Sequence, residues 1–266
     1  GGGVRTGVAV YVGKRRCIVR PDDAPRAFGP DDAAGDVHCR LPAEMAGRQQ
    51  AGLCVGDRVA FVERTDPGEG APFELTQVLP RRTVLVRRDP RTGQRRAIVA
   101  NVDVVAIVVS VVRPPLHPRL IDRYLIAIED SSVERAEGPH ADDPDPARPI
   151  ICLNKVDLLD ELPADERAAE LAKLEPYERL GIPVIRCSTV SERGIDELRR
   201  VLAGKTVAFV GHSGVGKSSL TNALDPRIAA KVGEVSAAYH KGRHTTTTAQ
   251  LYDVPNPNPN PNPNPH

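Results

Sequence analysis

The first ninety or so residues show short runs in which apolar and polar positions alternate, separated by turn-forming residues. Five runs have the length and composition of strands: residues 8–12, 17–19, 37–41, 57–63 and 73–79. Gly13 and Lys14 separate the first two runs and predict a hairpin. Five short strands in one stretch predict a small closed barrel, with the five-stranded OB-fold as the main candidate and an SH3-like barrel as the alternative.

The pattern changes after residue 98, where longer apolar runs alternate with segments of helical periodicity. Residues 102–111 are an almost continuous β-branched run, typical of a strand buried on both faces of a parallel sheet. Further strands are expected at residues 150–153, 184–187 and 206–210, and helices at residues 120–128, 163–180, 195–202 and 217–224. This alternation predicts a doubly wound α/β domain.

Two segments lack such periodicity. Residues 137–149, rich in Pro, Asp and Gly, are expected to form a surface loop. Residues 256–266 are Asn-Pro pairs followed by His266, and a proline at every second position excludes helix and sheet, so an unstructured tail is expected. The predicted organisation is a barrel over residues 1–90, an α/β domain over residues 91–255 and a disordered tail over residues 256–266.

A phosphate-binding motif lies between the last expected strand and the last expected helix. Residues 211–218 match G-x-x-x-x-G-K-S/T in the strand–loop–helix context that the motif requires. Lys217 is expected to reach the β- and γ-phosphates of a nucleotide, and the Ser218 hydroxyl to ligate Mg²⁺. The residues expected to contact nucleotide in this loop are Gly211, His212, Ser213, Gly214, Val215, Gly216, Lys217, Ser218 and Ser219.

A second motif, Asn154-Lys155-Val156-Asp157, directly follows the expected strand at residues 150–153, and it indicates which base is bound. The Asp157 carboxylate can accept two hydrogen bonds from the ring N–H and exocyclic amine of guanine, whereas adenine offers no such donor pair. Asn154 can brace the loop and the base edge, while the Lys155 stem covers the base plane. The pair of motifs predicts a guanine nucleotide site.

The order of the motifs is unusual for a GTPase. Ser188 and Thr189, which follow the next expected strand, resemble the short loop whose backbone supports the guanine oxygen. These base-contacting residues come before the phosphate loop, whereas ordinary GTPases have the opposite order. Because the loops meet at one edge of a single sheet, rejoining the chain elsewhere leaves the site intact. The sequence therefore predicts a circularly permuted P-loop GTPase domain.

These motifs resemble those of the ribosome small subunit-dependent GTPase A family of bacteria. The resemblance covers residues 4–255, including the barrel-like N-terminus, residues 100–103 before the first long strand, both nucleotide motifs and the Thr-rich segment 241–247. It implies GTP and GDP as ligands, Mg²⁺ as cofactor, and a role in late maturation of the small ribosomal subunit with stimulation by that subunit. It also implies that the barrel faces 16S ribosomal RNA, in a cytoplasmic protein expected to be monomeric.

The Thr-rich segment resembles the family's switch I, which orders around Mg²⁺ and the γ-phosphate. The spacing to Leu251 favours Thr247 as the metal ligand among several neighbouring threonines. The resemblance suggests that His244 orients or gates the attacking water, although a basic loop residue that contacts RNA is an equal alternative. Family members continue into an Asp-x-Pro-Gly switch II and a zinc-binding domain. Neither is found here, so the chain is expected to be a fragment that lacks the zinc site and has impaired turnover.

Composition and charge narrow the class of protein further. The longest central apolar run, residues 104–112, is too short to span a bilayer, so no membrane partner is expected. The five cysteines contain no C-x-x-C pair, which favours reduced thiols. The net charge is +1, yet the first hundred residues carry 17 basic against 12 acidic residues. Arginines concentrate in residues 81–96, opposed only by Asp89, and predict either a solvated face or a polyanion-binding patch.

Two other functions remain open at this point. A P-loop ATPase or nucleotide kinase would share the phosphate loop, but the Asn154–Asp157 motif argues against it. A non-enzymatic RNA-binding module that uses nucleotide only as a conformational signal would retain both motifs.

Overall fold

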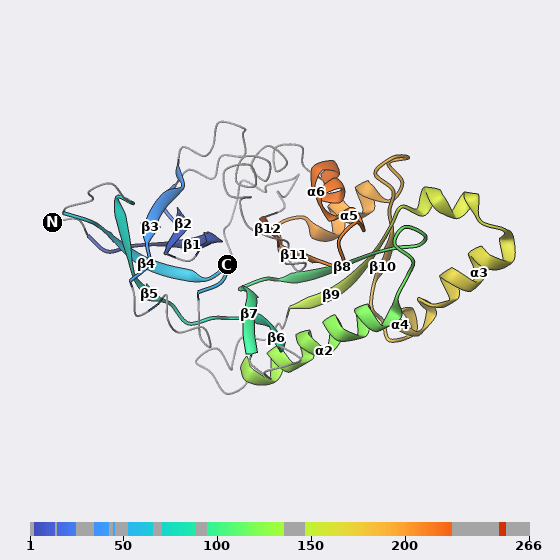
Figure 1. Ribbon diagram of the computed structural model, residues 1–266, viewed down its shortest axis with the longest axis horizontal. Helices are drawn as coiled ribbons and strands as arrows, with labels where there is room; N and C mark the ends of the chain where they lie inside the picture. The colour runs from blue at the N-terminus through green and yellow to red at the C-terminus, as the bar shows by residue number, and fades with distance from the viewer. Residues whose placement is uncertain are drawn as a thin grey trace, which may run out of the picture.

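The computed structural model describes residues 3–13, 15–24, 35–42, 45, 53–65, 71–88, 95–135, 147–224 and 250–253, which are called the described residues below. A barrel lies at one end of the long axis, and a sheet flanked by helices occupies the other (Figure 1). The tail at residues 256–266 and most of the expected loop at 137–149 lie outside the described residues.

The barrel is closed by the five strands that the alternating pattern predicts. They are β1 (Arg5–Val12), β2 (Arg16–Pro21), β3 (Val37–Arg40), β4 (Arg58–Glu63) and β5 (Phe73–Val78), in the spatial order β1-β2-β3-β5-β4. Buried residues alternate with less buried ones in β1 and β2, whereas β4 buries three consecutive residues. Val19, Phe61 and Leu75 are fully buried in the barrel core. The predicted OB-like barrel is confirmed.

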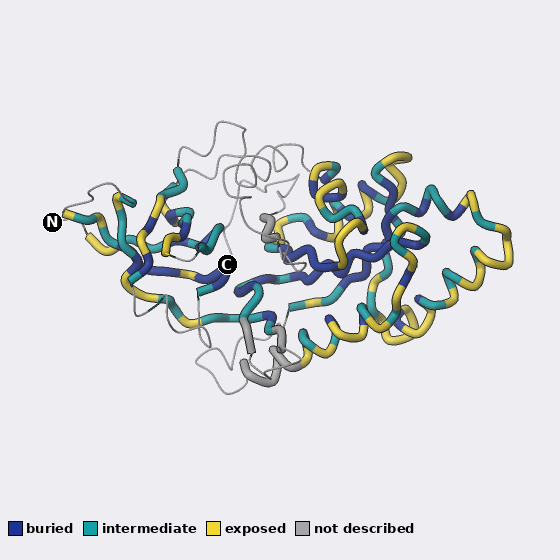
Figure 2. The backbone as a smooth tube through the Cα atoms, in the orientation of Figure 1, coloured by how far each residue is buried: buried dark blue, intermediate teal, exposed yellow. Residues whose placement is uncertain are grey.

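The second part is built on a five-stranded sheet. Its strands are β8 (Val104–Ser110), β9 (Arg148–Asn154), β10 (Val184–Arg186), β11 (Thr206–Val210) and β12 (Gln250–Asp253), in the order β10-β9-β8-β11-β12. The first four strands in that order run parallel, whereas β12 pairs antiparallel with β11. Every residue of the central strand β8 is buried, as its uninterrupted apolar run predicts (Figure 2).

Helices cover both faces of this sheet. Helix α2 (Pro118–Arg135) lies on one face and contributes Ile121 to the core cluster that also contains Ile107 and Ile151. Helices α5 (Ile195–Leu202) and α6 (Lys217–Leu224) lie on the other face and contribute Leu198 and Leu220 to the second core. The two cores confirm the doubly wound α/β architecture.

The helix expected at residues 163–180 is two shorter helices. Helix α3 (Ala164–Ala172) ends before a break, and α4 (Glu175–Arg179) begins with Pro176 near its N-terminus. Proline lacks a backbone N–H and is tolerated only in the first turn of a helix, so it restarts the chain as a separate helix. A short 3₁₀ helix, η2 (Val156–Glu161), was not foreseen by the pattern.

A two-stranded sheet of β6 (Val84–Arg88) and β7 (Arg95–Ala100) lies between the two parts. The sequence pattern did not indicate this hairpin. Leu85 and Val99 pack in the same core cluster as α2 and β8, so the hairpin packs with the α/β part. The domain boundary expected at residue 90 falls between its two strands, which pair with each other.

Strand β12 was also not expected from the sequence. It ends at Asp253, which pairs with Thr206 at the beginning of β11. None of the described helices combines the length and the hydropathy needed to cross a membrane. All five cysteines are free and buried.

Candidate nucleotide site

The candidate phosphate loop joins β11 to α6 at the carboxyl edge of the sheet. Gly211, Gly214 and Gly216 all have positive φ angles, a region that residues with a Cβ rarely adopt. A Cβ on Gly211 would lie 2.3 Å from the Val108 carbonyl oxygen, so the loop can follow β8 this closely only with glycine. The side chain of Val215 is buried beneath the loop, where it packs in the core cluster of α5 and α6.

Lys217 is the first residue of α6, and its side chain extends back along the phosphate loop. Its ammonium donates hydrogen bonds to the carbonyl oxygens of Gly211 and His212, each at 2.9 Å. Burial lowers the pKa of Lys217 below its usual value, and none of the ion pairs among the described residues involves it. A half-buried cation that contacts only neutral carbonyl oxygens fits an anionic ligand such as a phosphate.

Asn154 and Lys155 attach the loop at residues 154–157, called the base-reading loop for its expected guanine contacts, directly to the phosphate loop. The Asn154 amide donates to the Val215 carbonyl at 2.9 Å, and Lys155 Nζ donates to the Gly214 carbonyl at 2.7 Å and to the Arg113 carbonyl. Residues 154 and 214–215 are about sixty positions apart in the chain. The sheet topology therefore brings the two sequence motifs into contact, as expected for loops at one sheet edge.

Gly216 allows this close approach. A Cβ at this position would lie 2.4 Å from Asn154 Nδ2 and 3.9 Å from Lys155 Cε. Lys155 itself adopts a left-handed conformation with φ 61°, which turns its side chain from the end of β9 toward the loop. The contact between the two loops thus depends on one residue without a side chain and one residue with an uncommon backbone conformation.

Asp157 is oriented by the loop that follows β10. The Ser188 hydroxyl donates to Asp157 Oδ1 at 2.6 Å and accepts hydrogen bonds from the backbone N–H groups of Val190 and Ser191. Because Ser188 is fully buried, its hydroxyl is fixed, and it fixes the carboxylate in turn. From the sequence, Ser188 was expected to contact the guanine oxygen through its backbone. In the structure its side chain holds Asp157.

One acceptor in the site has no partner within the described part of the chain. Asn154 is 1 % exposed, and its Oδ1 atom makes no hydrogen bond there. Buried polar atoms are nearly always paired, so an unpaired acceptor beside the phosphate loop is consistent with a ligand group at this point. The donors of the phosphate loop itself, the Lys217 ammonium and the backbone N–H groups, together with the exposed Ser218 hydroxyl, fit a nucleoside phosphate with a divalent cation.

Other expected site residues are placed as follows. Ser213, Ser218 and Ser219 are exposed at the mouth of the loop, and the exposed His212 ring lies 2.9 Å from the Ser213 carbonyl. Thr189 is half-buried beside Ser188. His244 and Thr247 lie outside the described residues.

The structure also reveals a supporting residue that sequence analysis missed. Ser110 is buried at the carboxyl end of β8, and its hydroxyl donates to the Pro114 carbonyl at 2.6 Å. This contact shapes the turn whose Arg113 carbonyl accepts from Lys155. Its only sequence signal is a polar residue at the end of an otherwise apolar strand.

The arginine run at residues 81–96 does not act as one patch. Arg81 forms an ion pair with Asp57, and Arg82 with Asp103, in each case with a shortest distance of 2.6 Å. The expectation that only Asp89 opposes these arginines is therefore wrong for Arg81 and Arg82. Their carboxylate partners are distant in sequence and are brought to them by the fold.

Comparisons with known proteins agree with this geometry. A family model described as RsgA GTPase matches residues 78–138 and 140–258. The small ribosomal subunit biogenesis GTPase RsgA of Azotobacter vinelandii is 40 % identical over 226 residues, which are 84 % of this chain and 57 % of that protein. The chain thus spans little more than half the length of this curated relative.

Two solved structures share the fold. YjeQ from Thermotoga maritima superposes with a TM-score of 0.56 at 27 % identity, covering 84 % of this chain and 66 % of that one. YloQ, described as a circularly permuted GTPase, gives a TM-score of 0.52 at 24 % identity, covering 84 % and 65 %, and shows the fold alone. The barrel, the permuted order of the nucleotide loops and the family match lead to one conclusion: the chain belongs to the RsgA GTPase family.

Proposed function

We propose that this chain binds GTP and GDP with Mg²⁺ and hydrolyses GTP during biogenesis of the small ribosomal subunit. The observation that carries the proposal is the pair of contacts from Asn154 and Lys155 to the phosphate loop. These contacts set the base-reading loop at a fixed position relative to the phosphate loop, which a guanine nucleotide must span. The name of the Azotobacter vinelandii relative supports the role in small-subunit biogenesis.

Asp157 is the residue that would select guanine. With Oδ1 held by Ser188, the carboxylate has a fixed direction and retains Oδ2 and one lone pair of Oδ1 for the two guanine donors. An adenine base would leave this carboxylate without those donors. Leaving such a group unpaired can reduce binding by roughly 10⁴-fold.

Lys217 and the loop N–H groups would hold the phosphates, and the Ser218 hydroxyl would ligate Mg²⁺. When bound, Mg²⁺ neutralises developing charge on the phosphate oxygens. In the proposed site, Lys217 exchanges its two carbonyl contacts for phosphate oxygens, which compensate its charge better. We further propose Thr247 as a metal ligand and His244 as the residue that orients the attacking water.

Calorimetric titration tests the guanine assignment. We expect GDP to bind far more tightly than ADP, and Asp157→Asn to shift preference toward xanthosine diphosphate, whose ring carbonyl suits an amide donor. Asp160→Asn is the matched control, because Asp160 is an exposed carboxylate on the same 3₁₀ helix. Equal affinities for GDP and ADP in the unsubstituted protein would overturn the assignment and favour a P-loop ATPase or nucleotide kinase.

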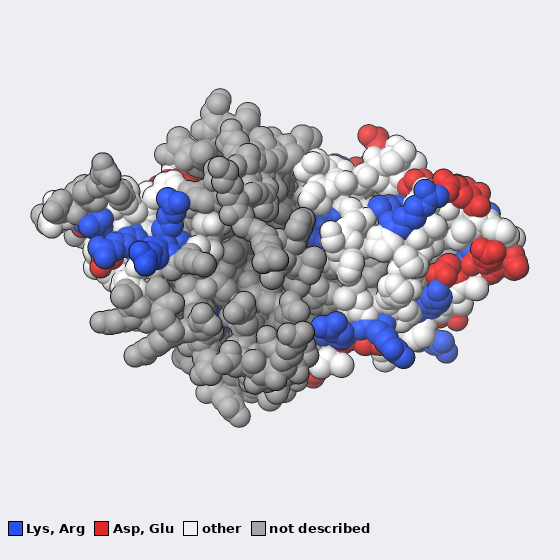
Figure 3. Space-filling view, in the orientation of Figure 1, with Lys and Arg blue, Asp and Glu red and all other residues white. Residues whose placement is uncertain are grey.

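We also propose that the N-terminal part contacts ribosomal RNA of the small subunit, 16S rRNA, through phosphates. Basic side chains gather over the described part of the barrel (Figure 3), where Arg15, Arg16 and Arg40 are exposed. In the β6–β7 hairpin the register sets Arg87 opposite Arg96 and Arg88 opposite Arg95. Like charges at opposite positions destabilise a sheet, so a polyanion there would be favourable. Such a protein would act in the cytoplasm, as a monomer, where ribosomal subunits mature.

A further inference from the structure

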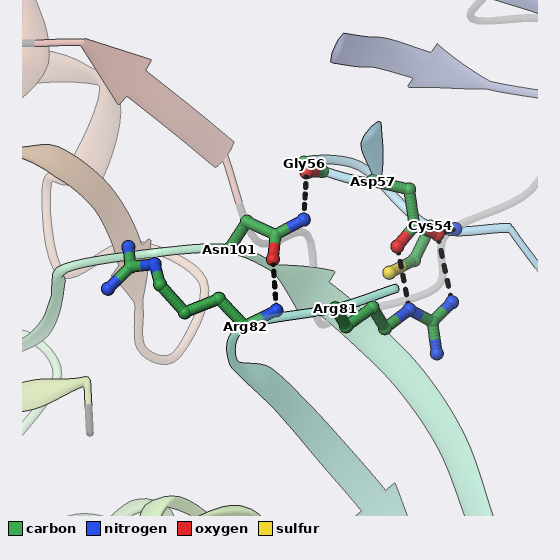
Figure 4. Close-up of polar contacts among 6 residues, drawn as sticks. All are labelled: Cys54, Gly56, Asp57, Arg81, Arg82 and Asn101. Atoms are coloured by element: carbon green, nitrogen blue, oxygen red, sulfur yellow. Dashed lines mark hydrogen bonds and ion pairs between the residues drawn. The ribbon is translucent and has the colours of Figure 1, made fainter. Parts of the chain in front are cut away.

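Within the described ranges, the barrel and the α/β part are attached at two points. The chain itself connects them through residues 79–83, between β5 and β6. The second attachment is not covalent: the barrel turn at residues 54–57 contacts the end of β7 (Figure 4). A single connecting segment leaves two domains free to reorient, whereas a second attachment removes that freedom. We call residues 54–57, 81–82 and 99–103 the joint.

An ion pair with a buried carboxylate lies on the barrel side of the joint. Asp57 is fully buried, and Arg81 contacts both of its carboxylate oxygens, with Nε 2.6 Å from Oδ1 and a terminal nitrogen 2.8 Å from Oδ2. The Cys54 backbone N–H also donates to Oδ2 at 2.8 Å. The hydrogen bond to Asp57 raises the pKa of Arg81, so the guanidinium remains charged. This geometry fixes the connecting segment to the barrel turn.

Asn101 and Gly56 form the contact between the barrel turn and the end of β7. The Asn101 amide donates to the Gly56 carbonyl at 2.9 Å and accepts from the Arg82 N–H at 2.7 Å, while the Ala100 N–H donates to the Val55 carbonyl at 2.9 Å. A Cβ on Gly56 would lie 2.0 Å from the Ala100 carbonyl oxygen. The two backbones therefore touch, and one side-chain amide holds three segments together.

Asp103 extends this set of contacts to the strand that carries the phosphate loop. Its Oδ1 accepts from Arg82 at 2.6 Å, and its Oδ2 accepts from the Thr206 N–H at 2.8 Å. Thr206 is the first residue of β11, and β11 leads directly into Gly211. Hydrogen bonds thus run without a gap from the barrel turn through the joint to the base of the strand that ends at the phosphate loop.

We propose that the joint holds the barrel and the nucleotide-binding sheet as one rigid body. Asn101, Asp57 and Arg81 are its positioning residues. A polyanion bound by the barrel is then held at a fixed orientation to the phosphate loop. Through this fixed orientation, nucleotide binding by the sheet and RNA binding by the barrel influence each other. This consequence for RNA rests on the proposed function, whereas the rigid joint does not.

Amide ¹⁵N relaxation of the full chain without nucleotide tests the joint directly. The unsubstituted protein is expected to give one rotational correlation time for amides of the barrel and of the parallel sheet. Asn101→Gly removes both side-chain hydrogen bonds and keeps the left-handed backbone, since Asn101 has φ 56°. In this variant the correlation time of the barrel should fall below that of the sheet. Gly56→Ala, which forces the two backbones apart from the other side, should do the same.

Thr76→Ala is the matched control, because Thr76 donates one hydrogen bond to Ala60 within the barrel and none to the joint. It should lower barrel stability without separating the correlation times. Separate correlation times in the unsubstituted protein, or a single one in both joint variants, would overturn the proposal.

Saturating GDP supplies a second readout: it should slow hydrogen exchange of the barrel core in the unsubstituted protein and not in Asn101→Gly. If GDP does not bind, the proposed function is contradicted. The relaxation experiment, which is done without nucleotide, then decides alone whether the joint is rigid.

Discussion

Single atoms decide whether the two nucleotide loops can meet. Gly216 has no Cβ, and the space that a Cβ would fill is occupied by the Asn154 amide. Asp57 shows the converse case, a buried charge that is tolerated because Arg81 contacts both carboxylate oxygens. For single residues, the effect of a substitution therefore follows from the contacts that the removed atoms made or that the added atoms would make.

Gly216→Ala should weaken GDP binding. The added methyl group displaces Asn154 and costs its hydrogen bond to Val215, which is worth about 0.5–1.5 kcal/mol, or up to about tenfold in affinity. Gly181→Ala is the control: Gly181 also has positive φ, but among the described residues only its chain neighbours come within 4 Å of where the added methyl group would lie. Calorimetry should show weaker GDP binding only for Gly216→Ala, and equal affinity in both variants would contradict the role given to Asn154.

Arg81→Met should destabilise the protein by about 3–5 kcal/mol, because it leaves the Asp57 carboxylate buried without its cation. Arg58→Met is the control: Arg58 pairs with Asp22 at the surface, where an ion pair contributes about 0–1 kcal/mol. Urea unfolding followed by circular dichroism measures both. Similar losses in the two variants would show that Asp57 is not held in a buried pair.

Nucleotide binding should take up protons at alkaline pH. Burial lowers the pKa of Lys217, so the free site loses its charge at a lower pH than an exposed lysine does. A bound phosphate favours the charged form and raises this pKa, so GDP affinity should fall as pH rises through the pKa of the free site. Binding enthalpies in two buffers of different ionisation enthalpy measure the uptake. Lys217→Arg, which stays charged, should abolish it, and buffer-independent enthalpies in the unsubstituted protein would rule it out.

At the scale of elements, short connecting structures position much of the candidate site. The 3₁₀ helix η2 and the loop after β10 are fixed to each other by the Val156 N–H, which donates to the Cys187 carbonyl at 3.1 Å, and by the Ser188–Asp157 contact. The β6–β7 hairpin packs Leu85 and Val99 against the α/β core, while four of its paired positions are arginine. One element thus combines a packing face with a concentration of positive charge.

The hairpin arginines should contribute to RNA affinity through phosphate contacts. The logarithm of the association constant should fall with log salt by about 0.7–0.9 per phosphate contacted, and Arg87→Ala with Arg88→Ala should reduce this slope. Arg167→Ala with Arg179→Ala is the control, because these arginines lie on α3 and α4, away from the hairpin. Filter binding of a structured RNA at several salt concentrations gives the slopes, and an unchanged slope in the hairpin variant would contradict this role.

At the scale of the whole molecule, connectivity and architecture are separate properties. The base-reading loop precedes the phosphate loop in the chain, yet both lie at the carboxyl edge of one sheet because β8, β9, β10 and β11 run parallel. The joint adds a fixed relation between this sheet and the barrel. The α/β part therefore carries the candidate nucleotide site at one edge of its sheet and the contacts to the barrel at the opposite edge.

Turnover of the 266-residue chain should be slow and little stimulated by small ribosomal subunits. The sequence after Thr247 contains no Asp-x-Pro-Gly, which in the proposed site would supply a carboxylate near Mg²⁺ and an amide for the γ-phosphate. Such groups act mainly in the transition state, so their loss lowers the rate more than nucleotide affinity. Single-turnover hydrolysis should show recovery of stimulation when a family-like C-terminal segment is added. Equal stimulated rates for the two chains would show that the segment is dispensable.

The amino-acid sequence by itself determined most of the strands and helices and the class of ligand to expect. Period-two alternation predicted the barrel strands, and the β-branched run at residues 102–111 predicted the buried central strand, because these patterns follow directly from which side chains must leave water. The phosphate loop and the Asn154–Asp157 motif identified the ligand class, since each requires particular residues at a fixed local spacing. Local patterns fail where a residue such as Pro176 divides a helix that the apolar periodicity continues.

Only the tertiary structure decided which distant residues meet. The pairing of Arg81 with Asp57, the support of Asp157 by the Ser188 hydroxyl and the contact of Asn101 with Gly56 each join segments separated by more than twenty residues. The β6–β7 hairpin likewise depends on α2, against which it packs, rather than on a strong pattern of its own. Hydrogen bonds and ion pairs of this kind are sensitive to changes of a few tenths of an ångström in the distance between their atoms. Sequence periodicity carries no information on the distance between segments.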